Sequence, residues 1–188
     1  MAIEKDILMA TSFEPASTPR LRCELHNAIT HFAHSTFECD MTDPHSIELV
    51  HFGSKRWANY FKVVLLGLQS VLPPEVRRNA HGTIKVLVDG TVPPESSLSS
   101  SAAMTTCSSI VILTALKALH VVPRKVIADV ACHSERLVGV HSGGMDQAVS
   151  VFGQRDKALF VSFAPTLHVS PIELPLGHQY VFLGRTHG

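Results

Sequence analysis

The sequence has no excess of charge of either sign and no cluster of basic residues. Its 188 residues include 16 Lys and Arg against 16 Asp and Glu. Nucleic acids and anionic membranes attract proteins through clustered basic side chains. The composition therefore argues against both classes of partner, and we expect no nucleic acid and no membrane among the partners.

Long apolar runs are also absent. The most apolar stretch, residues 104–119, is interrupted by polar side chains, and nothing in the sequence resembles a signal peptide. With 45% apolar residues, the chain can still bury the core of one domain. We expect a soluble, globular, cytoplasmic protein.

Residues that form disulfides or bind metals are few or scattered. No C-x-x-C pair occurs among the four cysteines, so reduced thiols are favoured over disulfides or zinc ligands. Among twelve histidines, His26, His31 and His34 cluster, but odd spacing in an alternating segment sends side chains to opposite faces of a strand. A metal site at these histidines is therefore disfavoured.

The hydrophobic pattern predicts both strands and helices, without an internal repeat. Alternation predicts strands at residues 3–10, 21–27, 36–39, 83–88 and 158–163, a turn-rich connector at 11–19 and a strand-like run at 180–183. Helical spacing predicts helices at residues 57–72, 101–119 and 124–138, and another that starts within 146–151. The aromatic stripe of the first helix is more typical of a core than of a ligand platform.

Residues 92–103, Val-Pro-Pro-Glu-Ser-Ser-Leu-Ser-Ser-Ser-Ala-Ala, organise the rest of the chain. A serine-rich loop follows the predicted strand 83–88 and leads directly into the N-terminus of a buried helix. A helix N-terminus carries unpaired N–H groups and roughly half a positive charge, so with hydroxyls it can bind phosphate oxygens and, through a hydroxyl, Mg²⁺. The alternative is a linker into a Ser-capped core helix.

Two acidic residues downstream extend this chemistry. Glu135 could supply the carboxylate that Mg²⁺ takes beside phosphate oxygens, and Asp146 follows paired glycines that let backbone approach a ligand. Together these are parts for phosphoryl transfer. The alternatives are a solvated Glu135 paired with Arg124 or Arg136, and Asp146 as a helix N-cap. No G-x-x-x-x-G-K-[ST] occurs, which excludes a P-loop.

These motifs resemble those of the GHMP kinase family, in the form found in its galactokinases. Residues 93–103 look like the second signature of the family, and residues 135–147, Glu-Arg-Leu-Val-Gly-Val-His-Ser-Gly-Gly-Met-Asp-Gln, are similar to the galactokinase version. Residues 1–10 and 57–61 also have counterparts there, and the fungal galactokinases are the nearest in pattern. The resemblance extends to about residue 175.

The resemblance implies an α+β fold, the GHMP kinase N-terminal lobe (ribosomal protein S5 domain 2-like), with a mixed sheet packed on helices. Residues 1–175 would form a partial lobe and 176–188 a tail, with the C-terminal lobe absent. The implied activity is ATP-dependent phosphorylation of galactose to galactose 1-phosphate. Two alternatives stay open: a non-catalytic galactose- and ATP-binding regulator, and an N-acetylgalactosamine kinase.

The resemblance also assigns the site residues, with ATP and Mg²⁺ as cofactors. Asp146 would be catalytic and, with Gly143 and Gly144, would bind the sugar. Ser100, Ser101 and Glu135 would hold Mg²⁺. The residues implied to bind ATP are Pro94, Ser96, Ser97, Leu98, Ser99, Ser100, Ser101 and Ala102.

The chain departs from the family pattern at three points. It lacks the first signature, Gly-Arg-x-Asn-x-x-Gly-Glu-His, and the glycine-rich third one, and Ser97 replaces the usual glycine before Leu98. By the resemblance, the first signature supplies an orienting cation and the third a phosphate-binding loop. Losing that cation and that loop together should cost several kcal/mol of transition-state stabilisation, on the order of thousands-fold in rate. We expect impaired activity, and self-association through an exposed half-core.

Overall fold

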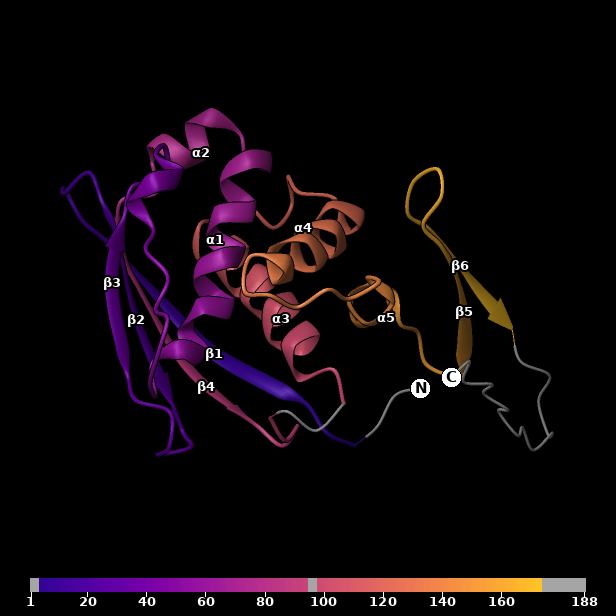
Figure 1. The fold of residues 1–188 in the computed structure, drawn as a ribbon. Helices are drawn as coiled ribbons and strands as arrows, with labels where there is room; N and C mark the ends of the chain where they lie inside the picture. Colours follow the sequence, from indigo (N-terminus) through magenta and orange to yellow (C-terminus); the bar gives the residue numbers. More distant parts are fainter. Residues whose placement is uncertain (1–3, 95–97, 174–188) are drawn as a thin grey trace.

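The computed structural model describes residues 4–94 and 98–173. A four-stranded sheet and a layer of helices form the main body, and a two-stranded hairpin follows at the C-terminal end (Figure 1). The strands are β1 Ile7–Pro15, β2 Leu21–Asn27, β3 Ser35–Cys39, β4 Gly82–Gly90, β5 Lys157–Ser162 and β6 His168–Glu173. The helices are η1 Pro44–Ser46, η2 Arg56–Ala58, α1 Asn59–Val71, α2 Pro74–Arg78, α3 Ser100–Ala115, α4 Arg124–Arg136 and α5 Met145–Phe152.

The main sheet is mixed, with the strand order β1-β4-β2-β3. Strand β4 pairs antiparallel with β1 and parallel with β2, and β2 pairs antiparallel with β3. Alternate residues of β2 and β4 are buried, as expected for strands with one face on a core. This face includes Leu21, Cys23, Leu25, Ile84 and Val86.

The helices cover one face of the sheet (Figure 1). Helix α3 lies in the middle of the layer and packs against α1, α4, α5 and β1. Most of its side chains are therefore buried, including hydroxyls such as Thr105 and Ser109, and the exposed Ile110 and Thr114 lie four residues apart on one stripe of the helix. The Ser109 hydroxyl donates to the Thr105 carbonyl at 2.9 Å, which satisfies it within the helix.

Most of the elements predicted from the pattern are confirmed. Residues 21–27 form β2, 83–88 lie within β4, and 36–39 and 158–163 correspond to β3 and β5 within one residue at each end. The helix predicted at 57–72 is the short η2 followed by α1, and 124–138 contains α4. The helix predicted to start within 146–151 is α5, which begins one residue earlier. The run 180–183 lies outside the described residues.

The bounds of two predicted elements are wrong, and one observed strand was not predicted. The first strand is β1, Ile7–Pro15, rather than residues 3–10, because pairing along all of β4 draws in the polar residues assigned to a connector. Helix α3 ends at Ala115 rather than at 119, because Lys117 adopts a left-handed conformation with φ 54°. Strand β6 was not predicted, since it contains Pro171, which the pairing with β5 accommodates on an edge strand.

The hairpin of β5 and β6 lies beyond α5, at the edge of the molecule (Figure 1). A small cluster that contains Ala128, Ala148 and Leu167 connects it to α4 and α5. Phe160 is nevertheless 54% exposed, and Phe163 and Ile172 are also exposed. Within the described ranges, no helix combines the length and the apolar character needed to cross a membrane.

Candidate functional site

The start of α3 is the first part of the candidate site. Strand β4 ends at Gly90, and helix α3 begins at Ser100. The N-cap residue Ser99 is left-handed, with φ 56°, and its side chain makes no capping hydrogen bond. Among the described residues, the N-cap of α3 therefore supplies no side-chain partner to its first N–H groups, which suits an anionic ligand.

A cavity of about 560 Å³ lies at this end of α3. Its polar lining residues include Ser100 and Ser101, together with Arg56 and His31. Its lining also includes three aromatic residues, here called the aromatic wall: Phe32, Trp57 and Tyr60. The volume is within the range of small-molecule and cofactor sites, and a lining with both hydroxyls and aromatic rings suits a ligand with a phosphate and a flat ring.

The aromatic wall was missed by the sequence interpretation, which assigned these side chains to the core. Trp57 does belong to the core, since it is 9% exposed and its indole N–H donates to the carbonyl of Ala33 at 2.9 Å. It also lines the cavity, as does Tyr60 three residues later. The sequence did contain a signal for this wall: two aromatic residues with polar atoms, three positions apart at the start of a helix, lie on the same helix face.

Glu135 is the second part of the candidate site. It lies in the last turn of α4, is 0% exposed, and accepts a hydrogen bond at Oε1 from the Thr105 hydroxyl at 3.3 Å. Burial raises the pKa of this carboxyl, while the side chains of Ser142, Thr105, Ser101 and Gln147 oppose the shift. Because Glu135 is buried, its alternative interpretation as a solvated residue paired with an arginine is wrong.

The surroundings of Glu135 fit a divalent cation. Its Oε2 atom is buried and has no hydrogen-bond partner among the described residues. Ser101 both lines the cavity and lies near the carboxylate, so it connects the two. In the parts of the chain that the structure covers, no three His, Cys, Asp or Glu side chains gather as a metal cage. Mg²⁺ seldom needs one, because it binds through one or two carboxylates plus phosphate oxygens.

Asp146 and its glycines are the third part. Asp146 is half-buried in the first turn of α5, and the N-cap of that helix is Gly144. The alternative role of Asp146 as the N-cap is therefore wrong. Helix α5 packs against both α3 and α4, which places Asp146 on the same helical layer as Ser101 and Glu135.

The structure brings some of the predicted residues to one cavity and leaves others outside it. Pro94, Ser100 and Ser101 line the 560 Å³ cavity, and Leu98, Ser99 and Ala102 do not. The residues Glu135, Gly143, Gly144 and Asp146 do not line it either. Ser96 and Ser97 lie outside the described residues, so the substitution at Ser97 has no structural account.

The two glycines of the predicted sugar loop differ in how much they constrain it. Gly144 has φ 84°, and a Cβ there would lie 3.0 Å from Cys132 Sγ and 3.1 Å from Phe163 Cε1. A Cβ on Gly143 would contact nothing within 4 Å, and its φ is not positive. Gly144 thus holds the loop against α4 and the hairpin.

Replacement of Gly144 by alanine should lower the free energy of unfolding by about 1–2 kcal/mol, because an L-residue is strained at positive φ. The matched change Gly143→Ala should stay within about 0.5 kcal/mol of the wild type. Urea unfolding followed by circular dichroism measures both. Equal effects of the two substitutions would contradict the assigned role of Gly144.

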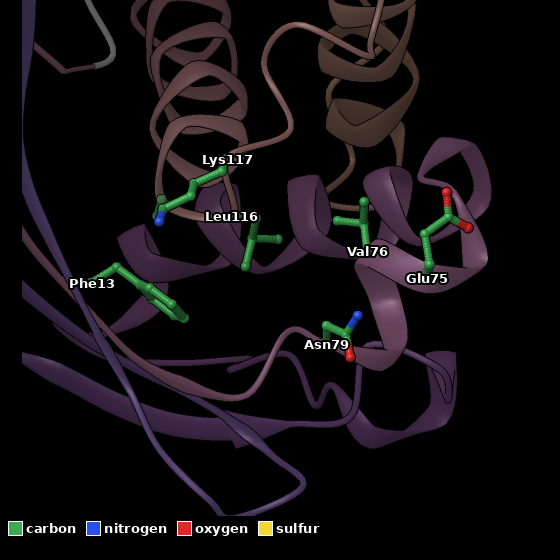
Figure 2. Close-up of a pocket in the computed structure, with 7 residues that line it drawn as sticks. Phe13, Glu75, Val76, Asn79, Leu116 and Lys117 are labelled. Carbon is green, nitrogen blue, oxygen red and sulfur yellow. The ribbon is translucent and has the colours of Figure 1, made fainter.

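A second cavity, of about 300 Å³, lies at the opposite end of α3. Figure 2 shows Phe13 of β1 and Lys117 after α3 on one side of it, and Glu75 and Val76 of α2 with Asn79 just after that helix on the other. None of the residues predicted to bind ATP, sugar or Mg²⁺ lines this cavity.

Comparisons with known proteins agree with the motifs. A family model described as GHMP kinases N terminal domain matches residues 59–154. The galactokinase of Schizosaccharomyces pombe is 30% identical over 191 residues, which cover 97% of this chain and 36% of that protein. The galactokinase of Candida albicans is 32% identical over 177 residues, covering 94% and 33%.

The fold agrees with a solved structure as well. Lactococcus lactis galactokinase complexed with galactose has a TM-score of 0.70, covering 93% of this chain and 40% of that chain, at 22% identity. The predicted fold, an α+β lobe with a mixed sheet packed on helices, is thereby confirmed. The chain spans about a third of the length of the curated relatives it matches. From its motifs, its fold and the family match over residues 59–154, the chain belongs to the GHMP kinase family.

Proposed function

We propose that the chain belongs to a galactokinase-type sugar kinase, which transfers the γ-phosphoryl group of ATP to the 1-hydroxyl of galactose. The observation that carries this proposal is the cavity at the start of α3, connected through Ser101 to the buried carboxylate of Glu135. We assign residues 1–175 to a partial GHMP kinase N-terminal lobe, and the tail expected at 176–188 lies outside the described residues. The galactokinase relatives support the choice of reaction.

ATP would lie in the 560 Å³ cavity. Ser100, Ser101 and the N-terminal N–H groups of α3 suit the phosphates, because a helix N-terminus favours negative charge. The aromatic wall of Trp57 and Tyr60 suits the base. The other residues proposed for the nucleotide are Pro94, Ser96, Ser97, Leu98, Ser99 and Ala102.

Mg²⁺ would be held by Glu135 and Ser101, with Ser100 beside them. Bound there, the ion would neutralise charge on the phosphate oxygens. The protein contributes a carboxylate that Thr105 orients and a hydroxyl that faces both the cavity and that carboxylate. The buried oxygen of Glu135 that has no partner supports this assignment.

Asp146 would act on the sugar, with Gly143 and Gly144 beside it. In the reaction, the oxygen of the sugar 1-hydroxyl bonds to the γ-phosphorus, the bond from that phosphorus to the β,γ-bridging oxygen breaks, and ADP leaves. Asp146 orients the hydroxyl and accepts its proton. The paired glycines leave room for the sugar, since a side chain at Gly143 would contact nothing within 4 Å.

Calorimetric titration of the chain with Mg·ATP, with and without galactose, tests the proposal beside a coupled assay for ADP. We expect saturable binding of Mg·ATP that Ser101→Glu weakens at least about tenfold, because the new charge repels phosphate. Ser70→Glu, at an exposed position on α1, is the control and should bind normally.

The outcomes separate the alternatives. Absence of Mg·ATP binding would contradict the proposed function. Binding of both ligands without ADP formation would favour the regulator, and turnover with N-acetylgalactosamine but not galactose would favour the other kinase.

We also propose self-association through the β5–β6 hairpin. This sheet has two strands, so each has an edge without a strand partner among the described residues, and Phe160 and Ile172 are exposed on it. Light scattering should show a mass that rises with concentration, and Phe160→Glu should reduce it. Phe52→Glu, at another exposed phenylalanine, should not. A monomer at every concentration would contradict this.

A further inference from the structure

Three buried polar side chains, one from each of three helices, form a cluster beneath the candidate site. They are Thr105 of α3, Glu135 of α4 and Gln147 of α5, and each is 0% exposed. The function proposed above uses Glu135 as a metal ligand and Thr105 only as the group that orients its carboxylate. Gln147 has no assigned role there, although burial makes a polar side chain costly unless it is hydrogen-bonded.

Thr105 joins Glu135 to the start of α3. Its hydroxyl oxygen lies 3.1 Å from the carbonyl oxygen of Ser101, 3.3 Å from that of Ala102 and 3.3 Å from Glu135 Oε1. A threonine hydroxyl has one hydrogen, so these three acceptors share a single donor. Any movement of the first turn of α3 therefore changes the strength of the hydrogen bond that Thr105 donates to Glu135.

Gln147 joins the loop that carries the paired glycines to the same carboxylate. Its side-chain amide donates to the Ser142 hydroxyl at 3.1 Å, and Gln147 and Ser142 both lie around Glu135. Ser142 also contacts the Cys132 thiol at 3.9 Å, the same sulfur that a side chain at Gly144 would meet. Gln147 thus holds the position of the loop just before Asp146.

The cluster is incompletely satisfied, which an ordinary core would not favour. Gln147 Oε1 and Glu135 Oε2 are buried and have no hydrogen-bond partner in the described part of the chain. Apolar residues of similar volume would avoid that cost. The presence of this cluster at the junction of α3, α4 and α5 therefore requires another explanation.

We propose that Thr105 and Gln147 are positioning residues that couple the start of α3 to residues 141–147, the loop before α5 and its first turn, through Glu135. The coupling has one consequence that rests on the proposed function: the binding of galactose raises the affinity for Mg·ATP. By linkage, Mg·ATP then raises the affinity for galactose by the same factor. The physical connection between α3 and the loop does not depend on either ligand.

Hydrogen exchange of the ligand-free chain, followed by mass spectrometry, tests the connection. Thr105→Val should raise exchange rates in residues 141–147 at least about threefold, and Gln147→Leu should do the same in residues 100–104. Thr105→Ser keeps the hydroxyl and should restore the wild-type rates. Ser109→Ala is the control. It removes a buried hydroxyl from the same helix, but that hydroxyl donates to the backbone carbonyl of Thr105 and not to Glu135.

Calorimetry then separates the two proposals. With both ligands bound by the wild type, Thr105→Val and Gln147→Leu should reduce the mutual enhancement to about onefold, and Ser109→Ala should keep it. If Thr105→Val changes hydrogen exchange in residues 141–147, and Gln147→Leu changes it in residues 100–104, but neither ligand binds, the coupling is supported and the proposed function is contradicted. Exchange changes confined to the substituted helix, or equal changes in Ser109→Ala, would overturn the coupling.

Discussion

Replacement of Asp146 by alanine should lower galactose-dependent formation of ADP by about 10²- to 10⁴-fold, the usual contribution of a positioned general base. On the function we propose, the Asp146 carboxylate orients the sugar hydroxyl and accepts its proton. Asp146 does not line the 560 Å³ cavity, so the affinity for Mg·ATP should stay within about twofold of the wild type. A coupled assay for ADP and a calorimetric titration measure the two effects.

The control for this prediction is Asp129→Ala, which removes a half-buried carboxylate from α4 at a position outside the candidate site. It should leave both the rate and the affinity unchanged. An Asp146→Ala variant with wild-type turnover would remove Asp146 from the reaction, whereas a loss of Mg·ATP binding would show that it acts on the nucleotide.

Replacement of Phe61 by alanine should lower the free energy of unfolding by about 3–5 kcal/mol. Phe61 is 0% exposed on α1 and belongs to the core between the helices and the sheet. Its loss removes apolar burial and leaves a cavity that the surroundings fill only in part. Small domains are typically stable by about 5–15 kcal/mol, so much of the stability would be lost.

Phe52→Ala is the matched control, because Phe52 is 88% exposed and its truncation should change stability by less than about 0.5 kcal/mol. Urea unfolding followed by fluorescence of Trp57 gives both midpoints. Similar shifts for the two variants would show that α1 does not pack as described.

Local pattern was sufficient to predict much of the fold and the main motifs. Strand β2 was predicted at its observed bounds, because its alternation matches one face on the core. The end of α1 was predicted from Pro73 and Pro74, since the residue before a proline avoids helical geometry. The serine-rich start of α3 and the carboxylate of Glu135 were also identified, because helix N-termini and acidic residues carry recognisable chemistry.

Contacts between distant residues decided the rest. Strand β1 extends to Pro15 because β4, more than 60 residues later, pairs with it along nine positions. Pattern left Glu135 either solvated or functional, and packing of α4 on α3 buried it against Thr105. The aromatic wall of the cavity brings together Phe32, from the connection between β2 and β3, with Trp57 of η2 and Tyr60 of α1. Periodicity reports which face of an element is buried, but the identity of its neighbours comes from tertiary packing alone.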